Sequence, residues 1–233
     1  MSAAPVICID GPSGAGKGTV SRALAAELGW HFLDSGALYR VLAIAAEDRA
    51  VALTQVDALA ALAQALELAF DGDAMAERIL LYGEDVTPRV RAEATGERAS
   101  RLAAHPPVRE ALLERQRRFR MPPGLVADGR DMGTVVFPDA ALKLFLIASP
   151  EERARRRAKQ LSQLGLDANV RQLTAGIRAR DERDRTRRVA PLQPAEDARV
   201  VDSTTLDIPG VLQQVRTLAA ERGLTGRGMG TRS

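Results

Sequence analysis

The 233-residue chain contains a single cysteine, Cys8, and only two histidines, His31 and His105. One cysteine cannot form a disulfide bond within the chain, and Cys8 lies in an apolar run where a buried packing role is expected. Two histidines argue against a histidine-rich metal site. So little cysteine fits a reducing compartment, and we expect the protein to be cytoplasmic.

Long apolar runs are also missing from the sequence. No uncharged apolar segment approaches the length of a membrane span, and the N-terminus lacks the basic patch and apolar stretch of a secretory signal. We therefore expect no membrane partner. Only eight residues are aromatic, which leaves few rings to stack on bases and argues against nucleic acid as a partner.

Lysine is scarce, because 30 of the 33 basic residues are arginines and only Lys17, Lys143 and Lys159 are lysines. A compact ammonium group and a planar guanidinium group are not interchangeable. Lys17 lies in a glycine-rich segment, so its retention there indicates a special role. Arginine use that reflects only a base-rich genome is the alternative.

That glycine-rich segment follows the apolar run Val6–Ile9 and has the spacing G-x-x-x-x-G-K. Its glycines permit backbone torsions that let consecutive N–H groups point into one concavity at the start of a helix, where an anion is favoured. A turn that matches by chance is the alternative. We expect this phosphate loop to bind a nucleoside triphosphate through Gly11, Pro12, Ser13, Gly14, Ala15, Gly16, Lys17, Gly18 and Thr19.

Short β-branched runs alternate with longer helical patterns along the chain, which predicts an α/β fold with a mainly parallel sheet. We expect strands at 6–9, 31–33, 125–127, 142–147 and 199–201, and helices at 17–28, 37–48, 107–118, 151–164, 168–187 and 209–222. Residues 55–102 interrupt this rhythm with an alanine- and leucine-rich helix, a hairpin of 67–70 and 78–82, and the segment Gly83-Glu84-Asp85. They read as an insertion in a substrate lobe.

Residues 151–188 carry twelve basic and six acidic side chains, an excess of +6 in a chain whose net charge is +3. Such a concentration suits a polyanionic small ligand or nucleic acid. Because the two predicted helices have little apolar surface to bury, we expect a mobile flap. The glycine-rich residues 223–233 are expected to be disordered.

Asp34 to Arg40 follow the second predicted strand and open a helix, at the strand end where ligands bind in open α/β sheets. Ser35 is a natural N-cap residue. Tyr39 and Arg40 lie one turn further on, so an anion, a sugar edge and an aromatic face can be met together. A capped surface helix without a ligand is the alternative.

Residues 125–133 form a buried strand that ends in Asp-Gly-Arg-Asp. Asp128 at the strand tip has the position of a carboxylate linked to Mg²⁺ in phosphate-loop proteins. Arg130 and Asp131 leave the sheet on the ligand side. A charged turn with paired side chains is the alternative.

Arg180, Asp184 and Arg187 are spaced i, i+4, i+7 and are expected on one face of the second flap helix. Such a face can close over phosphates with guanidinium groups while its carboxylate receives a hydroxyl group. A solvated face with ion pairs is the alternative, and we favour it for Arg183 and Arg185.

Five segments together, GPSGAGKGT, DSGALYR, DGRDMGTVVFPDA, RDERDR and VVDSTTL, resemble the bacterial cytidylate kinases, which are P-loop nucleoside monophosphate (NMP) kinases. The resemblance implies a P-loop kinase fold with a five-stranded parallel core, an inserted NMP-binding lobe and a helical lid. The implied parts are core (1–34, 105–150 and 189–222), NMP lobe (35–104), lid (151–188) and tail (223–233).

The resemblance also implies the reaction ATP + CMP → ADP + CDP, with dCMP accepted and Mg²⁺ required, in an enzyme that we expect to be a monomer. By the family pattern Arg40, Arg130 and Arg187 hold the acceptor phosphate, and Arg180 and Asp184 approach the ribose. The base is read by Ser100, Arg109 and Asp131, with Ser35 and Tyr39 nearby. Uracil would present a carbonyl to Asp131 where cytosine presents an amino group, and an unpaired buried group is costly.

No side-chain nucleophile is required, because an oxygen of the acceptor phosphate attacks directly. We expect Mg²⁺, Lys17 and Arg130, with the lid residues Arg155, Arg180 and Arg187, to stabilise the transferred phosphoryl group. Gly18 occupies the position where the P-loop motif usually has a Mg²⁺-binding serine or threonine. Mg²⁺ is therefore expected on phosphates and waters, without an assigned protein ligand.

Two other functions are open at this point. A kinase for adenylate, shikimate or a sugar acid would share the phosphate loop and the lid, but not the DSGALYR and DGRDMG pair. A nucleotide-gated switch or RNA-binding module would use the arginine-rich lid, although no Asn-Lys-x-Asp guanine signature is present.

Overall fold

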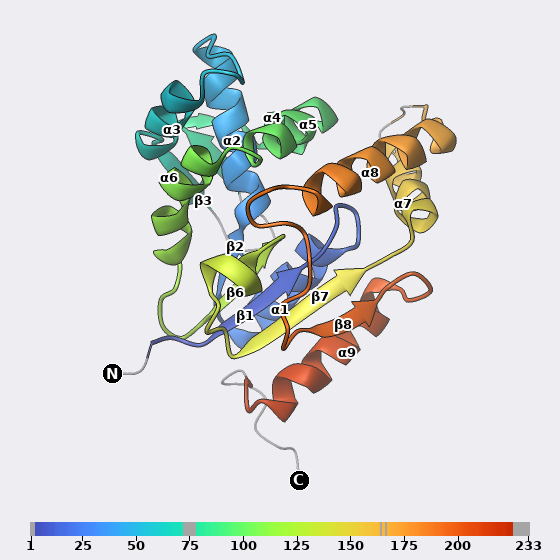
Figure 1. Ribbon diagram of the computed structural model, residues 1–233. Helices are drawn as coiled ribbons and strands as arrows, with labels where there is room; N and C mark the ends of the chain where they lie inside the picture. Colours follow the sequence, from blue (N-terminus) through green and yellow to red (C-terminus); the bar gives the residue numbers. More distant parts are fainter. Residues whose placement is uncertain (1–2, 72–77, 164, 166, 226–233) are drawn as a thin grey trace.

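The centre of the molecule is a sheet of five parallel strands in the order β2-β6-β1-β7-β8 (Figure 1). The computed structural model describes residues 3–71, 78–163, 165 and 167–225. The strands are β1 (Val6–Asp10), β2 (His31–Asp34), β6 (Leu125–Gly129), β7 (Leu142–Ile147) and β8 (Arg199–Asp202). The predicted α/β fold with a five-stranded parallel sheet is confirmed.

Helices cover both faces of this sheet, and the alternation of side chains along β1 sorts them. Ile7 and Ile9 pack in an apolar cluster with α1 (Lys17–Leu28) and α9 (Ile208–Glu221). Val6 and Cys8 pack on the other face with Leu38 of α2 (Ser35–Asp48) and with η1 (Met132–Val136), a single π-helical turn. Burial raises the pKa of Cys8, as expected for a packing residue.

The carboxyl ends of the neighbouring strands β2, β6 and β1 carry acidic residues that the parallel register brings together. Asp34 of β2 lies opposite Asp128 of β6, and Asp10 of β1 lies opposite Gly129. Asp10 is buried and accepts the backbone N–H groups of Met132 and Gly133, each at 2.8 Å. It therefore ties the end of β1 to the start of η1, which follows Arg130 and Asp131.

The predicted NMP lobe, called the NMP lobe below, forms most of a second apolar core beside the sheet. It contains α2, α3 (Val56–Gln64), α4 (Thr87–Arg91), α5 (Glu93–Leu102) and the antiparallel strands β3 (Leu68–Asp71), β4 (Arg78–Leu81) and β5 (Glu84–Asp85); α6 (Pro106–Arg117) packs against α3. The predicted pairing of the hairpin strands is confirmed. Glu84 and Asp85, which follow the predicted hairpin, pair with Leu81 and Leu80 and add a third strand.

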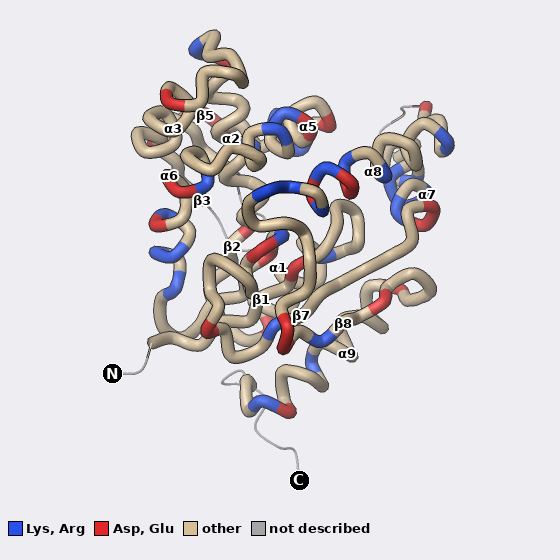
Figure 2. The backbone as a smooth tube through the Cα atoms, viewed as in Figure 1, with Lys and Arg blue, Asp and Glu red and all other residues tan. Residues whose placement is uncertain are grey.

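The predicted lid, called the lid below, contains two helices, α7 (Pro150–Gln163) and α8 (Val170–Arg185), which pack against each other above the sheet edge (Figure 1). Figure 2 shows Lys and Arg concentrated along these helices and the segment after α8. Asn169 caps α8 by accepting the N–H of Gln172, so the helix begins two residues later than predicted.

Helix α8 also ends earlier than the sequence indicated, and this corrects one prediction. Its last residue is Arg185, so Arg187 is not on the helical face of Arg180 and Asp184. The chain turns back here, because the backbone N–H of Leu192 donates to the carbonyl of Asp184 at 2.8 Å. Arg187 nevertheless lines one cavity together with Arg180 and Asp184.

The predicted disordered tail falls mainly on residues 226–233, which lie outside the described residues. Leu224, near the start of this tail, packs against the sheet cluster, and its N–H donates to the carbonyl of Ala219.

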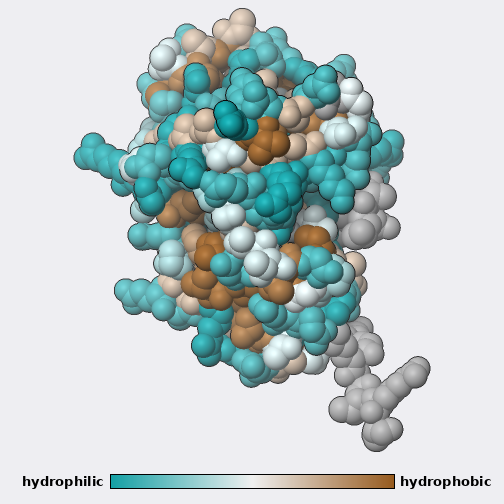
Figure 3. Space-filling model, turned by 90° about the vertical axis from the view of Figure 1, so that its right-hand side faces the viewer, coloured by the Kyte–Doolittle hydropathy of each residue, from teal (hydrophilic) through white to brown (hydrophobic). Residues whose placement is uncertain are grey.

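No helix in the described part of the chain combines the length and apolar character needed to cross a bilayer. The face in Figure 3 is largely hydrophilic, with apolar residues in limited groups.

Candidate active site

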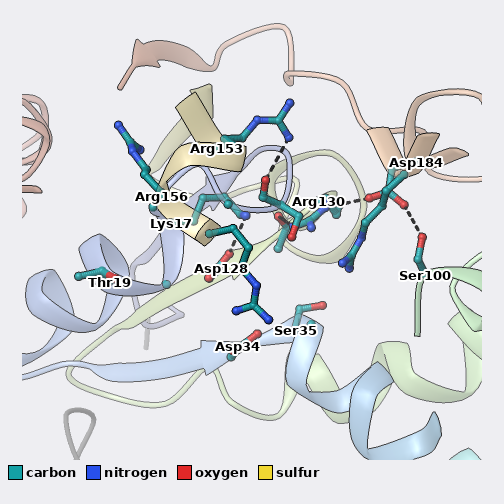
Figure 4. A pocket seen from close by; sticks show the side chains of 18 of the residues that line it. Lys17, Thr19, Asp34, Ser35, Ser100, Asp128, Arg130, Arg153, Arg156 and Asp184 are labelled. Atoms are coloured by element: carbon teal, nitrogen blue, oxygen red, sulfur yellow. Dashed lines mark hydrogen bonds and ion pairs between the residues drawn. The ribbon is translucent and has the colours of Figure 1, made fainter. Parts of the chain in front are cut away.

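A cavity of about 990 Å³ opens at the carboxyl ends of β1, β2 and β6, between the NMP lobe and the lid (Figure 4). It brings together residues that are far apart in the sequence. All the residues predicted to bind the acceptor substrate line it: Ser35, Tyr39, Arg40, Ser100, Arg109, Asp128, Arg130, Asp131, Arg180, Asp184 and Arg187. From the phosphate loop, Ser13, Gly14 and Gly16–Thr19 line it, whereas Gly11, Pro12 and Ala15 do not.

The backbone of the phosphate loop requires its glycines. Gly14 and Gly16 have φ values of 80° and 96°, which side chains strongly disfavour. Gly11 has φ 144°, and a Cβ atom there would lie 2.0 Å from the carbonyl oxygen of Leu146. Gly16 directly precedes Lys17, the first residue of α1, so the loop leads into a helix N-terminus as predicted.

Lys17 is held between this loop and the tip of β6. Its Nζ donates to the carbonyl of Pro12 at 3.1 Å and lies 3.6 Å from Asp128 Oδ1. The side chain is only 6% exposed, and its burial together with the neighbouring charge of Arg130 lowers the Lys17 pKa to about 8. Burial also raises the Asp128 pKa to about 6, against the pull of Lys17.

The surroundings of Gly18 fit a Mg²⁺ ion that is carried mainly by phosphates. A Cβ atom at Gly18 would lie 3.3 Å from Asp128 Oδ2, so the carboxylate borders the space left by the missing serine or threonine side chain. Asp34 lines the same end of the cavity. The described residues include no group of three or more metal-binding side chains, and Mg²⁺ prefers phosphates, waters and one or two carboxylates.

Several guanidinium groups converge on the cavity from different parts of the fold. Arg40 comes from α2 of the NMP lobe and donates to the carbonyls of Val90 and Ala92. Burial, with the neighbouring charges of Arg130 and Arg40, lowers the Arg180 pKa to about 10. Among the described residues, Arg180 Nε is buried without a hydrogen-bond partner. Cations that lie this close together favour an anion between them.

Asp184 of the lid connects this cluster to the rest of the molecule (Figure 4). Its Oδ2 lies 3.1 Å from Nε of Arg130, and its Oδ1 accepts the hydroxyl of Ser100 at 3.0 Å. Burial alone would raise the Asp184 pKa, but Arg130, Arg187 and Arg180 outweigh it and lower the pKa. Ser100, predicted to read the base, thus contacts Asp184, which was predicted to approach the ribose.

A second polar group lies at the α6 side of the cavity. Arg109 of α6 forms a buried ion pair with Asp131, and its guanidinium carbon lies 5.9 Å from the centre of the Tyr39 ring. Burial raises the Tyr39 pKa to about 12. This part of the cavity offers a carboxylate acceptor, guanidinium donors and an aromatic ring to a planar polar ligand.

Ser35 does not have the predicted role of N-cap. Asp34 caps α2 by accepting the N–H of Ala37 at 3.0 Å, and Ser35 is the first helical residue. The hydroxyl of Ser35 donates instead to Oε1 of Gln116 in α6 at 2.7 Å. Adjacent aspartate and serine are both good caps, and sequence alone did not separate them.

The model of the cytidylate kinase family matches residues 7–221 of this chain. A cytidylate kinase of Stutzerimonas stutzeri is 60% identical over 226 residues, which are 95% of this chain and 98% of that protein. The cytidylate kinases of Methylococcus capsulatus and Aeromonas hydrophila are 59% and 58% identical, covering 90% and 94% of this chain and 94% and 95% of their own lengths. The chain belongs to the cytidylate kinase family.

The resemblance to cytidylate kinases drawn from the five motifs is therefore confirmed. The family match includes the phosphate loop, the NMP lobe, the DGRDMG segment and the lid, so it does not rest on the phosphate loop alone.

Arg153 of α7 contacts the phosphate loop and was missed by the sequence analysis. Its buried side chain donates to the carbonyls of Ser13 and Ala148, each at 3.0 Å, and forms an ion pair with Asp181 of α8. Arg155, the predicted catalytic residue on the same helix, lines the cavity but is 74% exposed and pairs with Glu152. Helical spacing distinguishes the two, because Arg153 faces the core one turn after Ser149.

The segment after β8 also supports the phosphate loop, and the sequence analysis gave it no role beyond the family motif. The hydroxyl of Ser203 donates to the carbonyl of Ala15 at 3.0 Å, and Arg156 of α7 donates to the carbonyl of Ser203. Residues 204–208 line the cavity beside the loop. Arg157 and Lys159 of α7 also line the cavity and were not predicted to do so.

Proposed function

We propose that this cavity transfers the γ-phosphoryl group of ATP to CMP or dCMP, giving ADP and CDP or dCDP. One observation carries the proposal. A phosphate loop and an arginine cluster drawn from the core, the NMP lobe and the lid line the same cavity, in a chain of the cytidylate kinase family. Such a cavity suits two phosphorylated ligands that meet end to end.

The donor phosphates would lie against the backbone N–H groups of residues 11–19 at the start of α1, with Lys17 beside them. Mg²⁺ bound to these phosphates would neutralise charge as it develops in the transition state. Asp128, at the tip of β6 beside Gly18, would orient the waters around that ion. Arg153 would keep the loop in shape through the Ser13 carbonyl.

The acceptor phosphate would lie among Arg40, Arg130 and Arg187. Arg40 and Arg187 donate to backbone carbonyls, among them those of Val90 and Ala190, but these bonds use only some of their N–H groups. The remaining N–H groups could bind phosphate, which guanidinium groups contact through paired donors. Asp184 would hold Arg130 and approach the ribose, and Arg180 would follow the transferred group.

Arg109 and Asp131 would read the base. Cytosine presents an amino donor beside the N3 and O2 acceptors, which match a carboxylate and a guanidinium group respectively. Uracil would place a carbonyl oxygen against the buried Asp131 carboxylate, with no proton between them.

The reaction requires no covalent enzyme intermediate. An oxygen of the CMP phosphate attacks the γ-phosphorus, the bond from that phosphorus to the β,γ-bridging oxygen breaks, and ADP leaves with the electron pair. Lys17 and the arginines stabilise the charge on the transferred group, and a closed lid excludes water that would hydrolyse ATP. We also propose that the protein acts as a cytoplasmic monomer without a nucleic-acid partner.

A coupled assay of ADP release tests the proposal. The purified protein, ATP and Mg²⁺ would be mixed separately with CMP, dCMP, UMP, AMP, GMP and shikimate. We expect rapid release with CMP and dCMP, and at least a tenfold lower kcat/KM for the other acceptors. Preference for AMP or shikimate would support a different P-loop kinase, and acceptor-independent hydrolysis stimulated by RNA would support a nucleotide-dependent RNA-binding module.

A further inference from the structure

Gln116 is a buried polar residue of α6 that does not line the cavity. Gln116 is 2% exposed, and its Oε1 accepts a hydrogen bond from the hydroxyl of Ser35 at 2.7 Å. The other end of the amide, Nε2, approaches the carbonyl of Leu112 at 3.4 Å. Turning the amide over would bring two oxygens together at Leu112, so this contact supports the assigned orientation of Gln116.

The consequence for Ser35 follows from the chemistry of a hydroxyl group. A hydroxyl has one hydrogen and two lone pairs, and here the hydrogen is given to Gln116. Ser35 lines the cavity, so what its oxygen can offer a ligand is a lone pair. Left alone, a serine hydroxyl rotates and can donate or accept; Gln116 removes the first option.

The same face of α6 organises both polar groups at this end of the cavity. Arg109 and Gln116 are seven residues apart, which places them on one side of the helix two turns apart. Arg109 holds the Asp131 carboxylate, and Gln116 holds the Ser35 hydroxyl. A carboxylate and an oriented hydroxyl oxygen are both acceptors, and together they match a group that donates two hydrogens.

We propose that Gln116 fixes Ser35 as a hydrogen-bond acceptor and thereby makes the cavity select a pyrimidine with an exocyclic amino group over one with a carbonyl group at that position. The inference deepens the proposed function and rests on it. Gln116 is a positioning residue, because it acts through Ser35 and does not contact the cavity.

The test is the ratio of kcat/KM for CMP to kcat/KM for UMP in matched variants. Gln116→Leu has similar volume but no acceptor, so the Ser35 hydroxyl can turn and donate to the uracil carbonyl; we expect the ratio to fall at least tenfold. Gln116→Glu keeps an acceptor oxygen and should retain the ratio within threefold. Gln213→Leu, on an exposed position of α9, should leave the ratio unchanged.

A double-mutant comparison separates this role from general damage to the core. In a Ser35→Ala background there is no hydroxyl to orient, so Gln116→Leu should change the ratio no further. An equal loss in both backgrounds, an unaltered ratio in Gln116→Leu, or a lost ratio in a folded Gln116→Glu would each overturn the inference. Should Gln116→Leu fail to fold, Gln116→Met takes its place with the same expectation.

The wild-type protein distinguishes failure of this inference from failure of the proposed function. If the wild type phosphorylates CMP well but the ratio of kcat/KM for CMP to kcat/KM for UMP is the same in the Gln116 variants, only the role of Gln116 is refuted. A wild type without CMP-dependent ADP release refutes both.

Discussion

Ser100 in α5 of the NMP lobe donates a hydrogen bond of 3.0 Å to Asp184 in α8 of the lid. The other oxygen of the Asp184 carboxylate faces Arg130, which follows the core strand β6. One buried carboxylate therefore joins lobe, lid and core around the cavity, and the arginines beside it keep its pKa low despite its burial. Its charge has consequences for both binding and catalysis.

Replacing Asp184 by asparagine should weaken the handling of the acceptor. The amide can still accept the Ser100 hydroxyl, but its NH₂ group would face Arg130 and the cationic cluster would lose its counter-charge. Hydrogen bonds between charged groups contribute about 2 kcal/mol, so we expect kcat/KM for CMP to fall about 30-fold. Steady-state kinetics with varied CMP would measure this.

Asp139→Asn serves as the control for that substitution, because Asp139 is exposed and pairs only with Arg120 among the described side chains. Its kinetic constants should stay within twofold of the wild type. A similar loss in both variants would contradict the role assigned to Asp184.

Arg187 and Arg185 offer a second matched pair at the end of the lid. Arg187 reaches the cavity from the turn after α8, whereas Arg185 is 71% exposed and pairs with Glu182. If Arg187 stabilises charge on the transferred phosphoryl group, Arg187→Ala should lower kcat at least 100-fold and change the KM for ATP little. Arg185→Ala should change kcat less than twofold, and equal turnover in the two variants would remove Arg187 from the active arrangement.

The sequence predicted the sheet and the phosphate loop well because each depends on local chemistry. Buried parallel strands are short apolar runs, and the loop requires glycine where φ is positive, as at Gly14 and Gly16. Residues 34–40 and 128–131 could also be placed at the cavity, because the carboxyl ends of parallel strands meet at one sheet edge. Ser100 and Arg109 lie in helices, and only the family resemblance pointed to them.

The features that the sequence did not predict have a different cause, because they depend on contacts between residues far apart in the chain. Helix α5 contains Gly96, although glycine is a poor helix former. A Cβ atom at this position would lie 2.7 Å from a guanidinium nitrogen of Arg40, so close packing with this α2 side chain explains the glycine. The π-helical turn after Asp131 depends on Asp10, 122 residues earlier in the chain. The hydrogen bond of Ser35 to Gln116 likewise spans 81 residues, and no local sequence pattern predicts it.

Asp10 should leave a signature in the pH dependence of stability. Burial raises its pKa from 3.8 to about 7, against the two backbone hydrogen bonds that it accepts. Between pH 4 and pH 7 the folded state therefore binds more protons at this site than the unfolded state. Protonation of Asp10 therefore contributes to the free energy of unfolding. This contribution is fully present below pH 4 and is lost as the pH rises through 7, falling by about 2 kcal/mol between pH 5 and pH 7.

Urea unfolding of the wild type and Asp10→Asn at several pH values would measure this. Asp128 and Lys17 titrate in both proteins, so the difference between the two free energies of unfolding isolates Asp10. The advantage of the wild type should shrink as the pH rises from 5 to 7. A difference that is constant across this range would show that Asp10 is ionised throughout.

The scarcity of lysine leads to the last prediction, Lys17→Arg. The substitution keeps the positive charge, but the Lys17 ammonium group occupies a confined position between the Pro12 carbonyl and Asp128. A guanidinium group is larger and planar, and overpacking a filled site typically costs about 1–3 kcal/mol through displaced neighbours. Here the displaced neighbours are the phosphate loop and the tip of β6, so we expect kcat to fall at least 100-fold.

Lys143→Arg is the matched control, because the ammonium group of Lys143 pairs with the exposed Asp197 outside the cavity. It should keep full activity, whereas Lys17→Arg should lose activity while its thermal unfolding stays cooperative. Calorimetric titration with ATP would show whether the loss lies in binding or in turnover. Retained activity in Lys17→Arg would mean that the loop needs only a charge, and the arginine-rich composition would then explain nothing about the site.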